Sequence, residues 1–281
     1  MFVNVNEARL FFDVVGPKLS PIGDQMVERP TLLVLHGGPG FDHSTLRPYF
    51  DRFSDAFQVI YLDHRGCGRS SGDRDGWHLD QWADDIDQFC ETLGISKPVV
   101  FGQSFGGMVA MHYGARYPSK PAKLILSSTA AQFRLDATEQ MMRHLGGERP
   151  AELARAFFTA PSIELFEEYA AVCLPLYAQS DHPDAAEFRA RAIQRPEVAV
   201  HFFQDEMKSM DMRSEIAAIS CPTLVMGGAL DPVTPPICTN EIAQAIGDNA
   251  QLEMFDACGH GAHRDHPDAA ESVMRAFLRG G

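Results

Sequence analysis

The chain has 281 residues, of which 45% are hydrophobic and 22% are charged, a balance typical of a globular domain and not of a disordered, collagen-like or coiled-coil protein. Its formal net charge of −14 repels nucleic-acid phosphates and anionic lipid surfaces, so we expect neither nucleic acid nor a membrane as a partner. Six scattered cysteines without C-x-x-C spacing indicate reduced core or loop residues and imply no metal site.

The first residues, MFVNVNEARLFF, lack the basic segment and apolar run of a secretory signal. No apolar run in the chain is long enough to span a bilayer, so we expect a cytoplasmic protein. Residues 2–15 alternate between apolar and polar on either side of Asn6 and Glu7, which predicts an antiparallel hairpin. A loop rich in proline and glycine is expected after it.

Short, nearly continuous apolar runs bounded by glycine and proline follow, and they predict strands buried on both faces of a parallel sheet. The runs are 31–35, 58–62, 99–101, 123–126 and 223–226. Helical patterns, such as that over 77–94, separate them. Because strand and helix alternate, we expect an α/β fold with an open, wound sheet and right-handed crossovers.

From about residue 131 to residue 213 this alternation stops, and the segment has the pattern of successive helices. The predicted helices cover 137–147, 150–160, 162–179, 184–194 and 198–210. A long helical insertion between two strands is a candidate cap. We therefore predict a core made of residues 1–130 and 214–281 and a helical cap of residues 131–213.

The stretch VVFGQSFGG, residues 99–107, carries the main chemical motif. Gly102-Gln103-Ser104-Phe105-Gly106 matches the G-x-S-x-G nucleophile elbow, in which a serine occupies a strained turn between a strand and a helix. Small flanking residues are needed because this turn brings backbone close to backbone. An apolar strand precedes the motif and a helical pattern follows it, so we predict Ser104 as a nucleophile.

A serine hydroxyl is a weak nucleophile at neutral pH, so it needs a base and an acid that orients the base. The expected chain order is serine, acid, histidine. Asp231 follows the apolar run of residues 223–226, and His260 follows an alternating run over residues 251–255, so both lie beyond strand ends, where open α/β sheets bind ligands. His263 and His266 are alternative bases in the same loop, but His260 lies between two glycines that permit a tight turn.

Backbone N–H groups are also needed where negative charge develops in the transition state. The segment LHGGPG, residues 35–40, follows a strand and can supply one. Pro39 has no N–H, so we predict an oxyanion hole formed by the N–H groups of Gly38 and Phe105. In a third glycine-rich strand exit, DHRGCGRS, we expect Arg65 to brace neighbouring loops and not to touch substrate.

Taken in order, the motifs HGGPG, DHRGCGRS, GQSFGG, DPVTPP and GHG resemble those of the α/β-hydrolase superfamily and, within it, of the proline iminopeptidase-like group. The resemblance implies a mostly parallel, eight-stranded sheet with helices on both faces and a helical cap. It also implies no cofactor, and it implies a catalytic triad of Ser104, Asp231 and His260, the same three residues that spacing indicates.

Proline iminopeptidases hold the free amine of the substrate with glutamates of the cap. By this resemblance, the R-x-E and aromatic pattern of residues 195–203 implies Glu197 as an amine ligand, with Glu167 or Glu168 as the second. The family usually has tryptophan after the nucleophile, where this chain has Phe105. We also expect aromatic cap residues around the substrate, namely Phe157, Phe158, Phe166, Tyr169, Tyr177 and Phe202.

These features predict a serine hydrolase that cleaves a small amide or ester through an acyl-enzyme, with a small molecule or short peptide as substrate. An aminopeptidase for N-terminal proline is the first hypothesis. An esterase or lactonase, including one for acyl-homoserine lactones, is the alternative, and a non-catalytic ligand receptor on the same fold is the third. The sequence is compatible with a monomer or a homo-oligomer.

Overall fold

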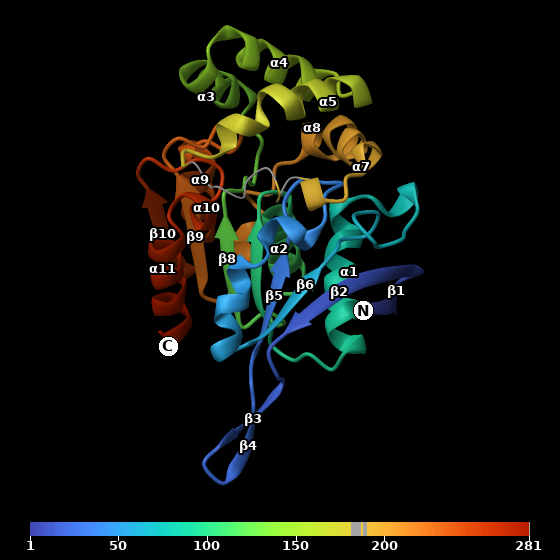
Figure 1. The fold of residues 1–281 in the computed structure, drawn as a ribbon, viewed down its shortest axis with the longest axis vertical. Coiled ribbons are helices and arrows are strands. Elements are labelled where there is room, and N and C mark those ends of the chain that lie inside the picture. The colour runs from blue at the N-terminus through green and yellow to red at the C-terminus, as the bar shows by residue number, and fades with distance from the viewer. Residues whose placement is uncertain (181–186, 188–189, 281) are drawn as a thin grey trace.

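A computed structural model describes residues 1–180, 187 and 190–280. Eight strands form the main sheet: β1 (Phe2–Val5), β2 (Ala8–Val15), β5 (Thr31–Leu35), β6 (Gln58–Leu62), β7 (Val99–Gln103), β8 (Lys123–Ser127), β9 (Thr223–Gly228) and β10 (Ala250–Phe255). Their spatial order is β1-β2-β6-β5-β7-β8-β9-β10 (Figure 1). The pairs β1–β2 and β2–β6 are antiparallel and all others are parallel. The predicted mostly parallel, eight-stranded sheet is therefore confirmed.

The N-terminal hairpin turns where the alternation predicts, at Asn6 and Glu7, whose φ angles are 43° and 64°. The prediction that only a loop follows this hairpin is wrong in part. Strands β3 (Leu19–Ile22) and β4 (Gln25–Glu28) pair into a second hairpin that projects from the end of the sheet opposite the helices of residues 135–172 (Figure 1). All four residues of β4 are exposed, so this hairpin lacks the buried apolar positions that mark a strand in a sequence.

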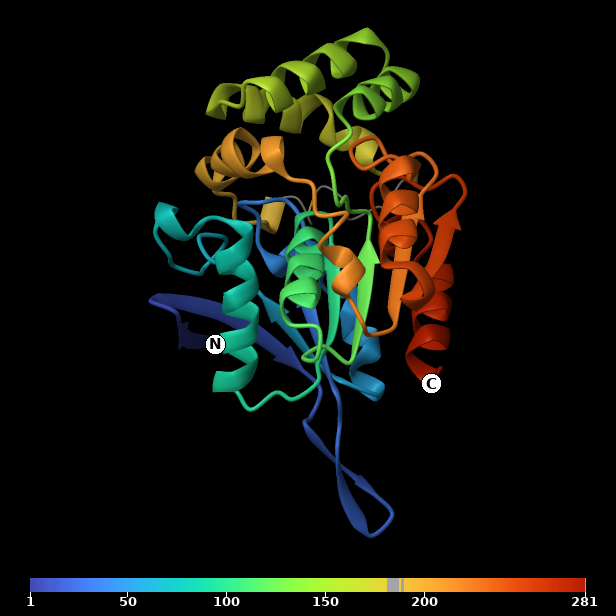
Figure 2. The same cartoon turned by 180° about the vertical axis from the view of Figure 1, so that it is seen from behind.

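Helices cover both faces of the sheet, as expected for an α/β fold (Figures 1 and 2). One face carries α1 (Leu79–Thr92), α2 (Phe105–Arg116) and α9 (Pro236–Ile246), and the other carries α11 (Pro267–Arg279) and a 3-10 helix (Tyr49–Asp55). Strand β5 contributes Leu33 to the first core and Leu32 to the second. Because successive side chains point to opposite faces, a fully apolar strand fills both cores.

Between β8 and β9 the chain leaves the sheet and forms a group of helices, here called the cap helices. They are α3 (Leu135–Gly146), α4 (Glu148–Thr159), α5 (Ile163–Val172), a 3-10 helix (Leu174–Tyr177), α7 (Pro196–His201), a π-helical turn (Phe202–Glu206) and α8 (Met207–Ser209). Figures 1 and 2 show them above the sheet, on the side to which its parallel strands point.

The predicted helices of this insertion agree with α3, α4 and the 196–209 segment. The predicted helix over 162–179 is shorter, because α5 ends at Val172 and a 3-10 helix follows. Pro175 has no N–H to donate to a carbonyl one α-helical turn earlier, which accounts for the change. The predicted helix over 184–194 falls partly outside the described residues.

All six cysteines are free and buried, as the scattered spacing predicts. Burial raises the pKa of the Cys67 thiol to about 12, so this group stays protonated and unreactive. Among the described residues, no helix has both the length and the apolar character needed to cross a membrane.

Candidate active site

Ser104 lies at the junction of β7 and α2 with a φ of 56° and a ψ of −120°, a strained conformation for a residue with a side chain. The flanking glycines are required by close backbone contacts. A Cβ on Gly102 would lie 2.3 Å from the carbonyl oxygen of Gly106, and a Cβ on Gly106 would lie 2.4 Å from that of Leu35. The turn that the G-x-S-x-G motif predicts is thus present.

The structure brings together the predicted acid and base. His260 Nδ1 lies 2.9 Å from Asp231 Oδ2 and 3.0 Å from Oδ1. Asp231 Oδ1 also accepts hydrogen bonds from the N–H groups of Val233 (3.0 Å) and Thr234 (2.9 Å), and Oδ2 accepts one from the Thr234 hydroxyl (2.8 Å). Burial opposes ionisation, but His260 and these donors hold the pKa of Asp231 below its ordinary value.

The ionised Asp231 places the proton of His260 on Nδ1 and leaves Nε2 as the basic nitrogen. His260 lines the same cavity as Ser104. The backbone N–H of His260 donates to the carbonyl of Tyr177 (2.7 Å), so a cap helix holds the histidine loop. A Cβ on Gly259 would lie 2.3 Å from that same carbonyl, which explains a glycine before the histidine.

The two predicted oxyanion donors also lie at the cavity. Phe105 is the first residue of α2, and the first N–H groups of a helix have no intrahelical acceptor. The N–H of Gly38, whose φ is 62°, donates to no acceptor within the described residues. A Cβ on Gly37 would lie 3.0 Å from Ser104 Cβ, so the loop passes directly beside the serine. This arrangement suits an anion at the serine.

A cavity of about 490 Å³ lies between the sheet and the cap helices, a size that suits a small substrate. Ser104, His260 and Gly38 line it together with many aromatic side chains. These are Phe41, Phe133, Phe157, Phe158, Phe166, Tyr169, Tyr177, Phe202 and Phe203. All six aromatic cap residues named from the sequence, Phe202 included, are therefore at the cavity.

The three glutamates predicted as substrate ligands are not in this lining. Glu197, Glu167 and Glu168 are exposed on the surface of the cap helices. On α5, the buried positions are Phe166 and Tyr169, three residues apart on one helix face, and the intervening glutamates point to other faces. No aspartate or glutamate lines the cavity in the part of the chain that the structure describes.

Four basic residues of the cavity were not predicted as substrate ligands from the sequence. Arg47, Arg52, His263 and Arg264 all line it. His263 appeared only as an alternative base, and the structure pairs Asp231 with His260 instead. The sequence offered one indication for two of them: His263 and Arg264 follow His260 in the same loop, so they could be expected near the proposed catalytic histidine.

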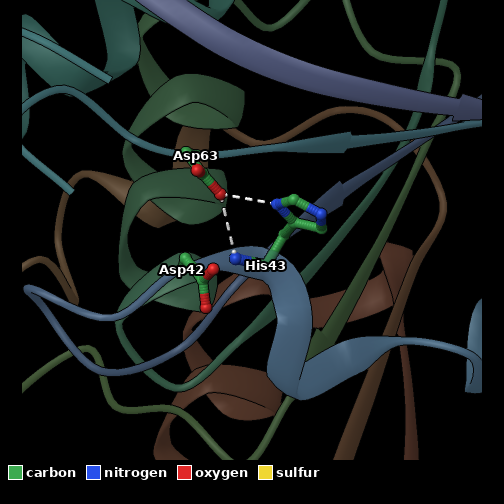
Figure 3. Close-up of side chains that lie close together, drawn as sticks. All are labelled: Asp42, His43 and Asp63. Carbon is green, nitrogen blue, oxygen red and sulfur yellow. Dashed lines mark hydrogen bonds and ion pairs between the residues drawn. The ribbon is translucent and has the colours of Figure 1, made fainter. Parts of the chain in front are cut away.

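Asp42, His43 and Asp63 form a group that could hold a metal ion, with ligand atoms within 4.8 Å of one another (Figure 3). Asp63 accepts from the Nδ1 (2.6 Å) and the backbone N–H (3.0 Å) of His43 and from the N–H of Arg69 (3.0 Å). Asp42 accepts from the Ser44 hydroxyl (2.5 Å) and the Arg69 guanidinium (2.9 Å).

Every carboxylate oxygen of that group therefore has a protein donor. Burial alone would raise the pKa of Asp63, but the contact with His43 and the other donors lowers it to about 2. The group ties the loop after β5 to the loop after β6, and it needs no metal to be satisfied.

Arg65 has the bracing position expected from the sequence. Its guanidinium contacts both carboxylate oxygens of Asp85 at 2.7 Å and the carbonyl of Asn6 at 2.6 Å. The pair is almost fully buried, so it links the hairpin turn, the loop after β6 and α1.

The family model described as the alpha/beta hydrolase fold matches residues 30–267. A proline iminopeptidase of Clostridium botulinum is 30% identical over 279 residues, which is 92% of either chain. A proline iminopeptidase of Pestalotiopsis fici is 28% identical and covers 99% of this chain and 98% of its own.

Solved structures with the same fold include a thermophilic esterase from Thermogutta terrifontis, with a TM-score of 0.74, 25% identity, and coverage of 99% of this chain and 97% of the esterase. They also include an enol-lactonase from Burkholderia xenovorans, with a TM-score of 0.76, 21% identity, and coverage of 100% of each chain. These similarities extend over nearly the whole chain.

Proposed function

Since this chain belongs to the alpha/beta hydrolase fold family and, within it, to the proline iminopeptidase-like group, we propose that it is a serine hydrolase that cleaves small amides or esters through an acyl-enzyme. The observation that supports this most directly is the pairing of His260 with the buried Asp231 at a cavity that Ser104 also lines. This is the arrangement that acyl transfer by a serine requires.

In the proposed reaction, Ser104 Oγ attacks the acyl carbon while His260 Nε2 takes its proton. Asp231 stabilises the imidazolium, and the N–H groups of Gly38 and Phe105 stabilise the oxyanion. His260 then returns the proton to the leaving amine or alcohol as its bond to the acyl carbon breaks. Water hydrolyses the acyl-enzyme in a second step, with His260 again acting as the base.

Two substrate classes follow from different observations. The names of the relatives favour release of an N-terminal proline. The cavity favours an ester or lactone, because its described lining holds no carboxylate to accept hydrogen bonds from a charged amine. An ammonium group buried without an acceptor is costly, so the ester or lactone is the candidate that the geometry supports better.

We also propose that residues 131–213 act as a cap on a core of residues 1–130 and 214–281. Side chains of the cap helices, Phe157, Phe166 and Tyr177 among them, complete the cavity wall. They would exclude water and admit apolar groups to Ser104.

Hydrolysis of L-prolyl-p-nitroanilide, its N-acetylated form and p-nitrophenyl butyrate tests both the reaction and the substrate class. Cleavage of the free-amine anilide alone would support the aminopeptidase, and cleavage of the butyrate with both prolyl compounds inert would support the esterase. The Ser104→Ala variant should lose about a millionfold in turnover. If this variant loses less than about a hundredfold, Ser104 is not the nucleophile and the proposal fails.

A further inference from the structure

Two basic residues of the cavity lining, His263 and Arg264, lie on the short helix α10 (Ala262–Asp265), which follows His260 in the chain. The side chain of His263 is more than nine-tenths buried, and neither of its ring nitrogens has a hydrogen-bond partner in the described structure. Buried polar groups without partners are uncommon, and at a cavity wall they indicate a missing ligand group.

The protonation state of His263 follows from its surroundings. Burial, and then the charge of Arg264, lowers the pKa of His263 well below 6.5. The ring is therefore neutral at pH 7, with one N–H to donate and one lone pair. It lies against Tyr49 and Phe50, with ring centroids 5.6 and 6.1 Å away.

Arg264 is a cation without an ion pair among the described residues, although the charges of Asp265 and Asp231 favour its charged form through space. Its Nη2 donates to the carbonyl of His260 at 2.6 Å, and no other acceptor or carboxylate within ion-pair distance is found for its guanidinium among residues 1–180, 187 and 190–280. The carboxylate of the neighbouring Asp265 accepts hydrogen bonds from the backbone N–H groups of Gly259, Gln179 and Ser180 and makes none with the Arg264 guanidinium. Burial lowers the pKa of Arg264, but an arginine stays charged at neutral pH.

The other two arginines of the cavity are neutralised. Arg52 contacts Glu271 at 2.6 Å and Asp268 at 3.5 Å, and Arg47 contacts Asp51 at 3.2 Å. Arg47 also pairs with Asp13. Of the three cavity arginines, Arg264 is thus the one without a carboxylate at ion-pair distance in the described part of the chain, and it lies in the loop of the proposed catalytic histidine.

We propose that Arg264 and His263 bind a carboxylate group of the substrate, so that the substrates are small apolar esters or lactones that carry a carboxylate. A guanidinium can donate to both oxygens of a carboxylate, and the neutral His263 can add a third donor. The aromatic walls would hold the apolar part of the same molecule. This inference rests on the proposed acyl hydrolysis by Ser104 and names the class of substrate for it.

A purely structural role of Arg264, through its bond to the His260 carbonyl, predicts a different result. Loss of such a bond would disturb the histidine loop and slow every substrate by the same factor. Loss of a carboxylate ligand would slow only substrates that carry a carboxylate. The ratio of kcat/KM for an acidic ester to that for its methyl ester therefore separates the two roles.

The experiment uses two such pairs: mono-p-nitrophenyl glutarate with its methyl ester, and 4-acetoxybenzoate with its methyl ester. They place the carboxylate on the acyl part and on the leaving group, respectively. Hydrogen bonds to charged groups correspond to about tenfold or more in affinity, so the wild-type ratio should exceed about ten for at least one pair. Arg264→Gln should lower that ratio about tenfold or more.

Arg52→Gln is the matched control, because it removes a cavity arginine that is already paired, and its ratio should stay within about threefold of the wild type. Wild-type ratios at or below one for both pairs overturn the inference, and this outcome needs no variant to fold. If Arg264→Gln and Arg52→Gln lower the ratio equally, the preference arises from the overall positive charge of the cavity and not from a carboxylate site at Arg264, and the inference fails. If the neutral esters are cleaved and Ser104→Ala abolishes this, the proposed function stands whatever the ratios are.

Discussion

Replacement of Asp231 with asparagine tests the proposed triad through the hydrogen bonds of a single carboxylate. Oδ1 of Asp231 accepts from the backbone N–H groups of Val233 and Thr234. The oxygen of an asparagine must take this position, because an amide NH₂ there would face two donors. The NH₂ group then takes the position of Oδ2, which lies 2.9 Å from His260 Nδ1.

An NH₂ at that position donates, so His260 Nδ1 must accept and the ring proton moves to Nε2. A protonated Nε2 has no lone pair for the proton of Ser104. The same exchange in a serine protease costs about ten-thousandfold in kcat, which corresponds to about 5 kcal/mol in the barrier. We expect a loss of that size here, because the two backbone donors at the Oδ1 position fix the orientation of the amide.

The assay is kcat/KM for p-nitrophenyl butyrate at pH 7, with the melting temperature as a check on folding. Thr234→Val is the matched control. It removes the hydroxyl that donates to Oδ2 and keeps both backbone donors and the tautomer of His260. The control should cost only about tenfold. A folded Asp231→Asn variant within about tenfold of wild-type activity would refute the assignment of the base and its tautomer.

Two further predictions concern stability. Gly106→Ala should lower the free energy of unfolding by about 1–3 kcal/mol, because the added Cβ would lie 2.4 Å from the Leu35 carbonyl oxygen. A variant that unfolds at the same urea concentration as the wild type would contradict this. Burial lowers the folded-state pKa of His64 and His263 well below the ordinary 6.5, so their neutral forms stabilise the fold above pH 6.5 and this stability is lost as the pH falls below it. Each of these buried histidines should therefore lower the free energy of unfolding by about 1 kcal/mol as the pH falls from 7.5 to 5.5. His64→Gln should reduce this pH dependence, and the exposed His144→Gln should leave it unchanged. An unchanged pH dependence in His64→Gln would refute the buried neutral state of His64.

The fold could be predicted because its strands carry their own signal. Every residue of β5 is buried, and a short run of mostly apolar residues between glycine and proline is typical of a strand with a core on each side. The hairpin of β3 and β4 could not be predicted in this way. Its residues, Pro21 and Gly23 among them, are mostly exposed, so no pattern of buried positions appears in the sequence.

Ser104, Asp231 and His260 could be located from the sequence because each position depends on local backbone. The serine needs a glycine-flanked turn, and the acid and base need only to follow strands that end at the same edge of the sheet. The glutamates of the cap could not be placed so easily. Whether Glu167 or Phe166 faces the cavity depends on how α5 is rotated against its neighbours, which a motif does not record.

Net charge has the same limit. A formal charge of −14 suggests that an anionic substrate would be repelled, but screening by salt confines the effect of exposed carboxylates to about 8 Å. Inside a cavity with aromatic walls the effective dielectric is low, and a guanidinium at hydrogen-bond distance acts with little screening. In the proposed carboxylate site, Arg264 would therefore outweigh the surface charge for a bound ligand, although the surface charge would still slow its approach. The sign of the field that a substrate meets is set by which carboxylates have already found partners, and this depends on the folded structure and not on composition.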